Sequence, residues 1–177
     1  MIVHAYKYQG AGNDFVIFDN RNGEYDCLTP QQIKLLCDRR FGVGADGMML
    51  LGKSDEYDFS MRYFNADGYE GSMCGNGGRC LVAFAAHRGI KKFDFNAIDG
   101  FHTAEVLEFT PHRCIVKLKM VDLEAGDKYS ENAYFLNTGS TILYTLPASC
   151  EPDLVTCDMI DLRCELFNLK SFSVNWK

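Results

Sequence analysis

The chain has 177 residues, a formal net charge of −6 at neutral pH and an apolar fraction of 47%. This length accommodates one domain, or one domain and part of another. The acidic balance argues against nucleic acid or an anionic membrane as a partner. No apolar run approaches the roughly 18 residues that cross a bilayer. Because the first residues are typical of a strand and not of a signal peptide, we expect a cytoplasmic protein.

Eight cysteines are many for a chain of this length, but none of them forms a CxxC pair. The spacing therefore predicts no structural zinc site, and we expect no metal. Without a secretion signal, a disulfide scaffold is not expected either. Most of these thiols should be small buried apolar groups, and Cys27, Cys37 and Cys114 lie in apolar surroundings that favour this.

The first part of the chain alternates short strands with turns. We expect strands over residues 2–8 and 15–19. Thr29 and Pro30 predict the start of a helix, because Thr is a good N-cap and Pro suits the first helical position. Two further strands are expected over residues 48–51 and 58–64, the second with alternating apolar residues on one face, which are Phe59, Met61 and Tyr63.

A cysteine in a glycine-rich turn then precedes the apolar run 81–86. This run predicts a helix that ends near Arg88, with Gly89 after it, and a helix that is apolar nearly all round belongs in the centre of a domain. The turn leaves backbone N–H groups unobstructed, and the helix start adds partial positive charge. Both favour an anion, either the thiolate of Cys74 or a substrate carboxylate beside it.

Strands are expected again over residues 92–96, 102–110 and 113–120. The elements together predict an α+β fold in which a mostly antiparallel sheet is curled around one central hydrophobic helix. Residues 121–140 are polar and then strand-like, and from Thr141 onward the regular pattern is lost.

Four motifs occur in order, at residues 10–15 (GAGNDF), 42–47 (GVGADG), 63–68 (YFNADG) and 73–80 (MCGNGGRC). Together they resemble the N-terminal half of diaminopimelate epimerase, over about residues 1–140. The resemblance implies two similar domains, each a sheet curled round a central helix, with the active site in the cleft between them. We assign residues 1–122 to the first domain and 123–177 to an incomplete second domain, truncated or replaced after about Ser140, with 141–177 as a tail outside the family.

The resemblance also implies an activity: interconversion of LL- and meso-diaminopimelate without a cofactor, on the route to lysine and peptidoglycan, by a homodimer. Cys74 matches one of the family's two catalytic cysteines. The residues that match the family's substrate contacts are Asn13, Asn65, Gly75 and Asn76. Where some members place a glutamine, this chain has Gly47, so that contact is not carried over.

Inversion of an α-carbon explains why such a site needs two thiols. One group removes a proton from one face, and a group of similar proton affinity delivers a proton to the other. A free thiol has a pKa of about 8.5, which a helix start lowers. Because two neighbouring thiolates repel each other, the pair should share one proton. The amides of Gly75 and Asn76 are the expected donors to the substrate carboxylate, where they stabilise the carbanion.

The resemblance stops before the family's second catalytic cysteine, which normally precedes a glycine. None of the three later cysteines does so: Cys150, Cys157 and Cys164. We therefore expect little or no epimerase activity from these 177 residues, and a first domain that lacks the closing strand that the family's C-terminus supplies. The alternatives are a proline racemase or hydroxyproline epimerase type of enzyme, a non-catalytic pseudoenzyme fragment, and a redox switch that uses Cys74 and Cys80.

Overall fold

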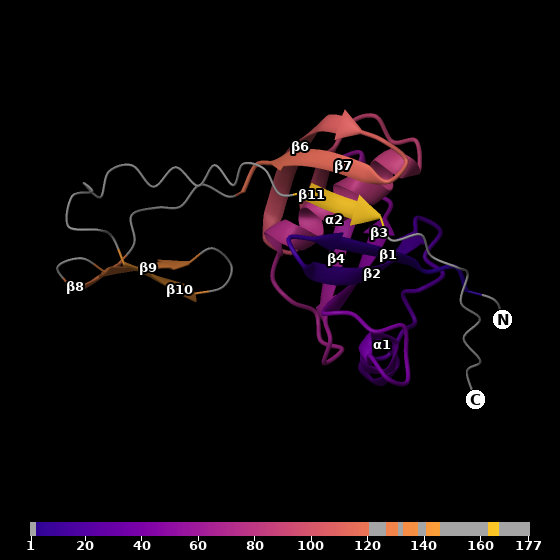
Figure 1. The fold of residues 1–177 in the computed structure, drawn as a ribbon, viewed down its shortest axis with the longest axis horizontal. Helices are drawn as coiled ribbons and strands as arrows, with labels where there is room; N and C mark the ends of the chain where they lie inside the picture. The colour runs from indigo at the N-terminus through magenta and orange to yellow at the C-terminus, as the bar shows by residue number, and fades with distance from the viewer. Residues whose placement is uncertain (1–2, 121–126, 131–132, 138–140, 146–162, 167–177) are drawn as a thin grey trace.

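Eight strands form one closed sheet around a central helix, in the order β1-β11-β7-β6-β5-β4-β3-β2 with β2 next to β1 (Figure 1). This computed structural model describes residues 3–120 and the strand segments 127–130, 133–137, 141–145 and 163–166. The strands of the closed sheet are β1 (Tyr6–Gly10), β2 (Asn13–Asn20), β3 (Gly47–Gly52), β4 (Phe59–Asn65), β5 (Asp94–Ala97), β6 (Gly100–Phe109), β7 (Arg113–Leu118) and β11 (Arg163–Leu166).

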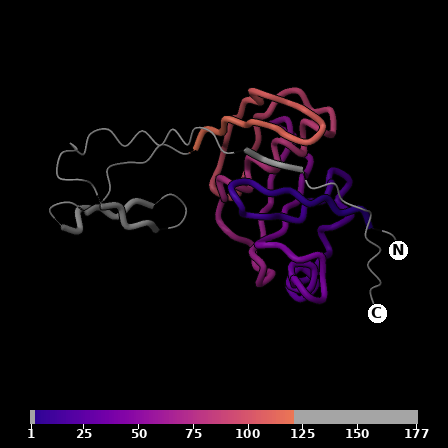
Figure 2. Tube along the Cα trace, viewed as in Figure 1, coloured from indigo at the N-terminus to yellow at the C-terminus, as the bar shows by residue number. Residues whose placement is uncertain are grey.

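The central helix is α2 (Gly75–His87), whose residues from Gly77 to Ala85 are all buried. The expectation of a hydrophobic helix in the centre of a curled sheet is thus confirmed. The other helix, α1 (Pro30–Cys37), packs on the outside of the sheet and lies at the bottom of the trace in Figure 2. Thr29 begins it with a capping box, in which Thr29 and Gln32 each bind the other's backbone N–H.

Strand β2 separates two hydrophobic cores because its side chains alternate between the two faces of the sheet. Phe15 and Ile17 point inward and pack with α2, whereas Val16 and Phe18 point outward and pack with α1. All four are at most 1% exposed. Burial on both faces explains why β2 is apolar at every one of these positions instead of alternating with polar residues.

The sheet is mostly antiparallel, as expected, but it contains two parallel pairs, β2 with β3 and β4 with β5. The register places the start of β2, the start of β3 and the end of β4 at the same end of the sheet, since Phe15 pairs with Gly47 and Gly47 pairs with Asn65. The first turn of α2 packs at this end, because Gly77 lies against Phe15 and Met49. This end of the sheet positions the candidate site.

The expectation that the closed sheet lacks its last strand is wrong. Strand β11 lies between β1 and β7 and pairs with both, so that Leu166 faces Tyr8 and Arg163 faces Ile115. The chain's own residues therefore cover both edges that would otherwise be exposed. A second sheet of three strands consists of β8 (Asp127–Ser130), β9 (Ala133–Asn137) and β10 (Thr141–Thr145).

The proposed domain boundary at residue 122 and the break at Ser140 lie outside the described residues, as do Cys150 and Cys157. The assignment of 123–177 to an incomplete second domain stays a prediction. Among the residues that the structure describes, no helix is long and apolar enough to cross a membrane.

Candidate active site

Cys74 is the N-cap of α2 and is half-buried. Its backbone is extended, and its carbonyl oxygen accepts a hydrogen bond from Gly78 N–H at 2.7 Å. The thiol makes no capping hydrogen bond to the helix. The amides of Gly75 and Asn76 belong to the first turn, where N–H groups have no intrahelical partner. The thiol and two first-turn amides therefore gather at the positive end of the helix.

The glycines at the start of α2 pack closely against side chains of the inner core. A Cβ at Gly78 would lie 2.6 Å from Cε of Met73 and 2.8 Å from Cδ2 of Leu118, and one at Gly77 would lie 3.0 Å from Sδ of Met49. A side chain at either position would force these neighbouring side chains to shift. The glycines thus hold the first turn, and Cys74 with it, against the inner core.

Asn13 is the first residue of β2, and its amide contacts Cys74. Its Oδ1 lies 3.8 Å from Sγ of Cys74, within the range of a sulfur hydrogen bond, and its Nδ2 donates to Oδ2 of Asp46 at 2.7 Å. The resemblance implies a substrate contact for Asn13. Its place at the end of the sheet brings an amide oxygen to the thiol.

Asn65 is the last residue of β4, at the same end of the sheet. Its Oδ1 accepts a hydrogen bond of 2.9 Å from the hydroxyl of Tyr63. Burial and the neighbouring Cys74 raise the pKa of Tyr63 to about 12, so that the phenol is a neutral donor at physiological pH. The ring of Tyr63 fills the space that a side chain at Gly47 would need, since a Cβ there would lie 2.6 Å from Cε2 of Tyr63.

Asn76, in the first turn of α2, is held by Arg79 from the next turn. Nη2 of Arg79 donates to Oδ1 of Asn76, and Arg79 is fully buried. The structure thus brings Cys74, Asn13, Gly75 and Asn76 together around the start of α2, with Asn65 at the same end of the sheet. Cys80 is fully buried inside the sheet, as expected.

An ionic cluster fixes the backbone beside Asn13. The carboxylate of Asp14 accepts two hydrogen bonds from Arg39, of 2.7 and 3.0 Å, and forms an ion pair of 2.8 Å with Lys7. Burial opposes ionisation of Asp14, but these cations outweigh it and hold the pKa of this carboxyl well below its usual range. Arg39 also reaches Asp46 at 2.8 Å, so the cluster joins the turn before β3 to the start of β2.

Sequence reasoning did not identify Asp46, Tyr63 and Arg79 as parts of this site. All three lie inside the four motifs, and Asp46 is the only charged residue in its glycine-rich motif. A single charged residue among glycines could have suggested a hydrogen-bond or ion-pair partner for Asp46.

The prediction that Cys27 is buried is wrong: it is exposed, whereas Cys37 and Cys114 are buried as expected.

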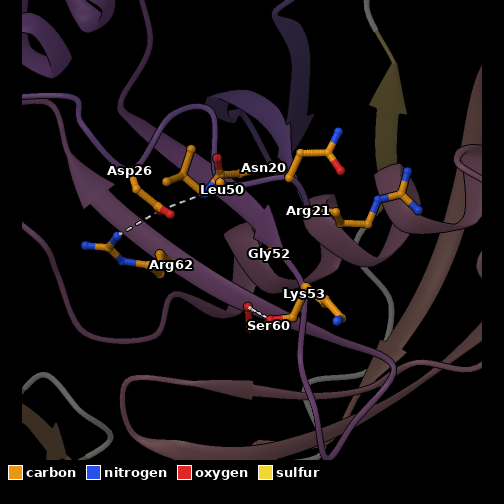
Figure 3. Close-up of a pocket in the computed structure, with 10 residues that line it drawn as sticks. Asn20, Arg21, Asp26, Leu50, Gly52, Lys53, Ser60 and Arg62 are labelled. Atoms are coloured by element: carbon orange, nitrogen blue, oxygen red, sulfur yellow. Dashed lines mark hydrogen bonds and ion pairs between the residues drawn. The ribbon is translucent and has the colours of Figure 1, made fainter.

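The surface also has a hollow of about 340 Å³ at the opposite end of the sheet (Figure 3). Its lining includes Asn20 at the end of β2, Gly52 at the end of β3 and Ser60 near the start of β4. Each lies five residues along its strand from the site end of the sheet, or roughly 17 Å. Arg62 at its rim pairs with Glu70 at 2.9 Å and with Asp26 at 3.6 Å. None of the expected site residues lines this hollow, so it is separate from the site at Cys74.

Solved structures with the same fold define the class of protein. A phenazine biosynthesis protein of the PhzF family from Bacillus anthracis aligns with 81% of this chain and 55% of its own, with a TM-score of 0.55 and 18% identity. A probable proline racemase from Agrobacterium radiobacter aligns with 81% of this chain and 51% of its own, with a TM-score of 0.53 and 12% identity. The chain therefore has the fold of PhzF proteins and proline racemases.

Sequence comparison then gives the family within this class. The model of the diaminopimelate epimerase family matches residues 5–117. The diaminopimelate epimerase of Flavobacterium psychrophilum is 49% identical over 137 residues, which are 76% of this chain and 52% of the relative, and that of Chlorobaculum tepidum is 44% identical over 74% of this chain and 52% of the relative. The chain belongs to the diaminopimelate epimerase family, and it spans about half the length of these relatives.

Proposed function

We propose that Cys74 is one of two bases in the epimerisation of LL-diaminopimelate to meso-diaminopimelate, without a cofactor. The observation that carries this proposal is the half-buried thiol at the start of α2, beside the amide oxygen of Asn13 and the first-turn amides of Gly75 and Asn76. The diaminopimelate epimerases that match this chain support the choice of substrate.

The reaction requires few groups from this chain. The substrate carboxylate binds the amides of Gly75 and Asn76, which stabilise the negative charge that develops when the Cα–H bond breaks. Cys74 as a thiolate takes this proton and becomes a thiol, or as a thiol gives its proton to the carbanion in the reverse direction. Inversion needs a second acid on the opposite face, which we place in a segment equivalent to the other half of the longer relatives.

The proposal carries with it the other expectations from the sequence. Diaminopimelate is the small-molecule partner, the enzyme acts in the cytoplasm on the route to lysine and peptidoglycan, and the assembly is a homodimer. With a single base, the 177-residue chain exchanges the α-proton on one face and does not invert the centre. Its epimerase activity is therefore negligible.

Incubation of the purified chain with LL-diaminopimelate in D₂O tests this. We expect slow deuterium incorporation at Cα with retained configuration, and its loss in Cys74→Ala. Cys27→Ala is the matched control, because it removes an exposed thiol elsewhere. Formation of meso-diaminopimelate by the chain alone would contradict the single base, and exchange that survives Cys74→Ala would contradict the role of Cys74. Proline in place of diaminopimelate tests the racemase alternative.

A further inference from the structure

A line of polar contacts runs from Arg39 to the thiol of Cys74. Nη2 of Arg39 lies 2.8 Å from Oδ1 of Asp46, and Oδ2 of Asp46 lies 2.7 Å from Nδ2 of Asn13. Oδ1 of Asn13 then lies 3.8 Å from Sγ of Cys74. These four residues come from the loop after α1, the turn before β3, the start of β2 and the start of α2. The line connects parts of the chain that are distant in sequence.

The chemistry of Asp46 determines the orientation of the Asn13 amide. An ionised carboxylate only accepts hydrogen bonds, so the edge of the amide that faces Asp46 must be the NH₂ group. The carbonyl oxygen is then on the opposite edge, toward Cys74. An amide oxygen accepts a hydrogen bond from a thiol, but it offers nothing favourable to a thiolate. The contact therefore directs the S–H group of Cys74 toward the Asn13 amide oxygen.

Asp46 is itself held by several contacts. Its Oδ2 also accepts from the backbone N–H of Asp14 at 3.2 Å, and its own backbone N–H donates to the carbonyl oxygen of Asp14 at 3.0 Å. Arg39 bridges the two carboxylates. Because the bonds between residues 14 and 46 are reciprocal, the Asp46 carboxylate keeps its place although its side chain is 43% exposed.

We propose that Asp46 is a positioning residue, which aims the amide oxygen of Asn13 at Cys74 and thereby keeps the thiol in a hydrogen bond that slows its reaction with electrophiles. A role of Asp46 in catalysis rests on the proposed function, whereas the effect of Asp46 on the Cys74 thiol does not. Other titratable or charged groups surround the thiol: the charge of Cys74 acts on Tyr63 of β4, and Arg79 of α2 approaches the Cβ position of Gly75. The test must therefore separate the effect of the orientation of the Asn13 amide from the effect of nearby charges on the thiol.

The rate of Cys74 alkylation by iodoacetamide, measured from pH 6 to 10 and followed on the Cys74 peptide by mass spectrometry, reports the reactivity of this thiol without a substrate. In Asp46→Ala the Asn13 amide is free to turn, and we expect Cys74 to react about three-fold faster at pH 7, because a weak hydrogen bond to the thiol is lost. In Asp46→Asn an acceptor oxygen remains although the charge is gone, and we expect a profile close to that of the wild type.

Two further variants complete the design. Asp67→Ala removes a carboxylate that also acts on Tyr63 but has no bond to Asn13, so it measures the effect of charge alone. In the Asn13→Ala background, Asp46→Ala should change nothing further. Equal profiles for Asp46→Asn and Asp46→Ala, or an unchanged rate in Asp46→Ala, would overturn the proposal.

The two proposals fail separately. If the chain does not exchange the α-proton of diaminopimelate, the proposed function fails for this chain, and the alkylation profiles still decide the role of Asp46. Thermal unfolding of each variant checks the fold. If Asp46→Ala does not fold, the comparison of Asp46→Asn with Asn13→Ala decides: a wild-type profile in the first and faster alkylation in the second supports positioning, and any other pair of results contradicts it.

Discussion

Arg79 donates a hydrogen bond of 2.5 Å to the amide oxygen of Asn76, one turn earlier on α2, and its side chain is fully buried. Within the described part of the chain, Nε and Nη1 of Arg79 are buried and make no hydrogen bond. A guanidinium remains charged under all ordinary conditions, so its burial opposes folding. The contact with Asn76 thus holds an amide at the N-terminal end of the helix at a cost to stability.

Replacement of this residue by an apolar one of similar length separates the two effects. We expect Arg79→Met to raise the free energy of unfolding by about 1–2 kcal/mol, since the buried charge disappears. Affinity for diaminopimelate should fall about five-fold, because the Asn76 amide loses the donor that fixes it. Urea denaturation and titration calorimetry measure the two quantities.

Arg88→Met is the matched control for Arg79→Met. Arg88 follows the same helix but stacks over the rings of Tyr6 and Phe84, 4.1 and 5.1 Å from their centroids. Its loss should lower stability by roughly 0.5–1 kcal/mol and leave affinity unchanged. A destabilised Arg79→Met protein would show that the buried guanidinium contributes to folding, and our account of it would be wrong.

Tyr63 holds Asn65 as Arg79 holds Asn76, through one hydrogen bond to the amide oxygen. Tyr63→Phe keeps the ring that packs edge-on against Phe15 at 6.1 Å between centroids, and removes only the hydroxyl that bonds Asn65. We expect diaminopimelate affinity to fall about three- to five-fold and the unfolding free energy to fall by about 1 kcal/mol. Tyr57→Phe is the control, since Tyr57 packs on Phe101, near the other end of β4, and its affinity should equal that of the wild type.

Tyr63 should also affect how the stability of the protein depends on pH. The pKa of Tyr63 is about 12 in the folded protein and near 10 in the unfolded chain. Folding therefore favours the protonated phenol, and this contribution is present below pH 10 and is lost as the pH rises toward 12. Thermal midpoints between pH 9 and 12 should fall less steeply in Tyr63→Phe than in the wild type. Parallel curves would contradict the assignment.

The motifs predicted the local structure of the site but not the contacts between its parts. Thr29, Pro30 and the apolar run after Cys74 placed both helices, because caps and periodicity are local signals. The amide partners of Asn13, Asn65 and Asn76 were not predicted. The bond between residues 13 and 46 depends on how β2 and β3 lie side by side.

The relative direction of neighbouring strands was not predicted from the sequence either. An apolar strand such as β3 has the same pattern whether its neighbour runs parallel or antiparallel, so the parallel pairs β2–β3 and β4–β5 were not predicted. Strand β11 was missed for a different reason: residues 163–166 show no clear alternation, and their place between β1 and β7 is determined by two vacant edges far away in the sequence.

The ionic cluster predicts a loss of stability in acid. Because Arg39 and Lys7 hold the pKa of Asp14 well below its usual range, the folded state favours the carboxylate. This contribution is present above the unfolded pKa, near 4, and is lost as the pH falls below it. Arg39→Met should lower the thermal midpoint by about 1–3 °C at pH 7 and by clearly less at pH 2, because the folded-state pKa of Asp14 lies so low that the stabilisation is only partly lost there. Arg40→Met, on the exposed neighbour, should change neither; an equal loss at both pH values in Arg39→Met would exclude the ion pair as its cause.

Strand β11 predicts how the chain responds to shortening at its C-terminal end. Removal of residues 163–177 takes away the strand that pairs with both β1 and β7, and the backbone groups on two strands lose their hydrogen-bond partners. Exposed strand edges pair with other chains, so we expect this variant to self-associate at micromolar concentration and to unfold at a lower temperature. Removal of residues 167–177 alone keeps β11 and should leave the oligomeric state unchanged. Sedimentation velocity compares the two variants with the full chain, and identical profiles for all three would show that β11 does not close the sheet in solution.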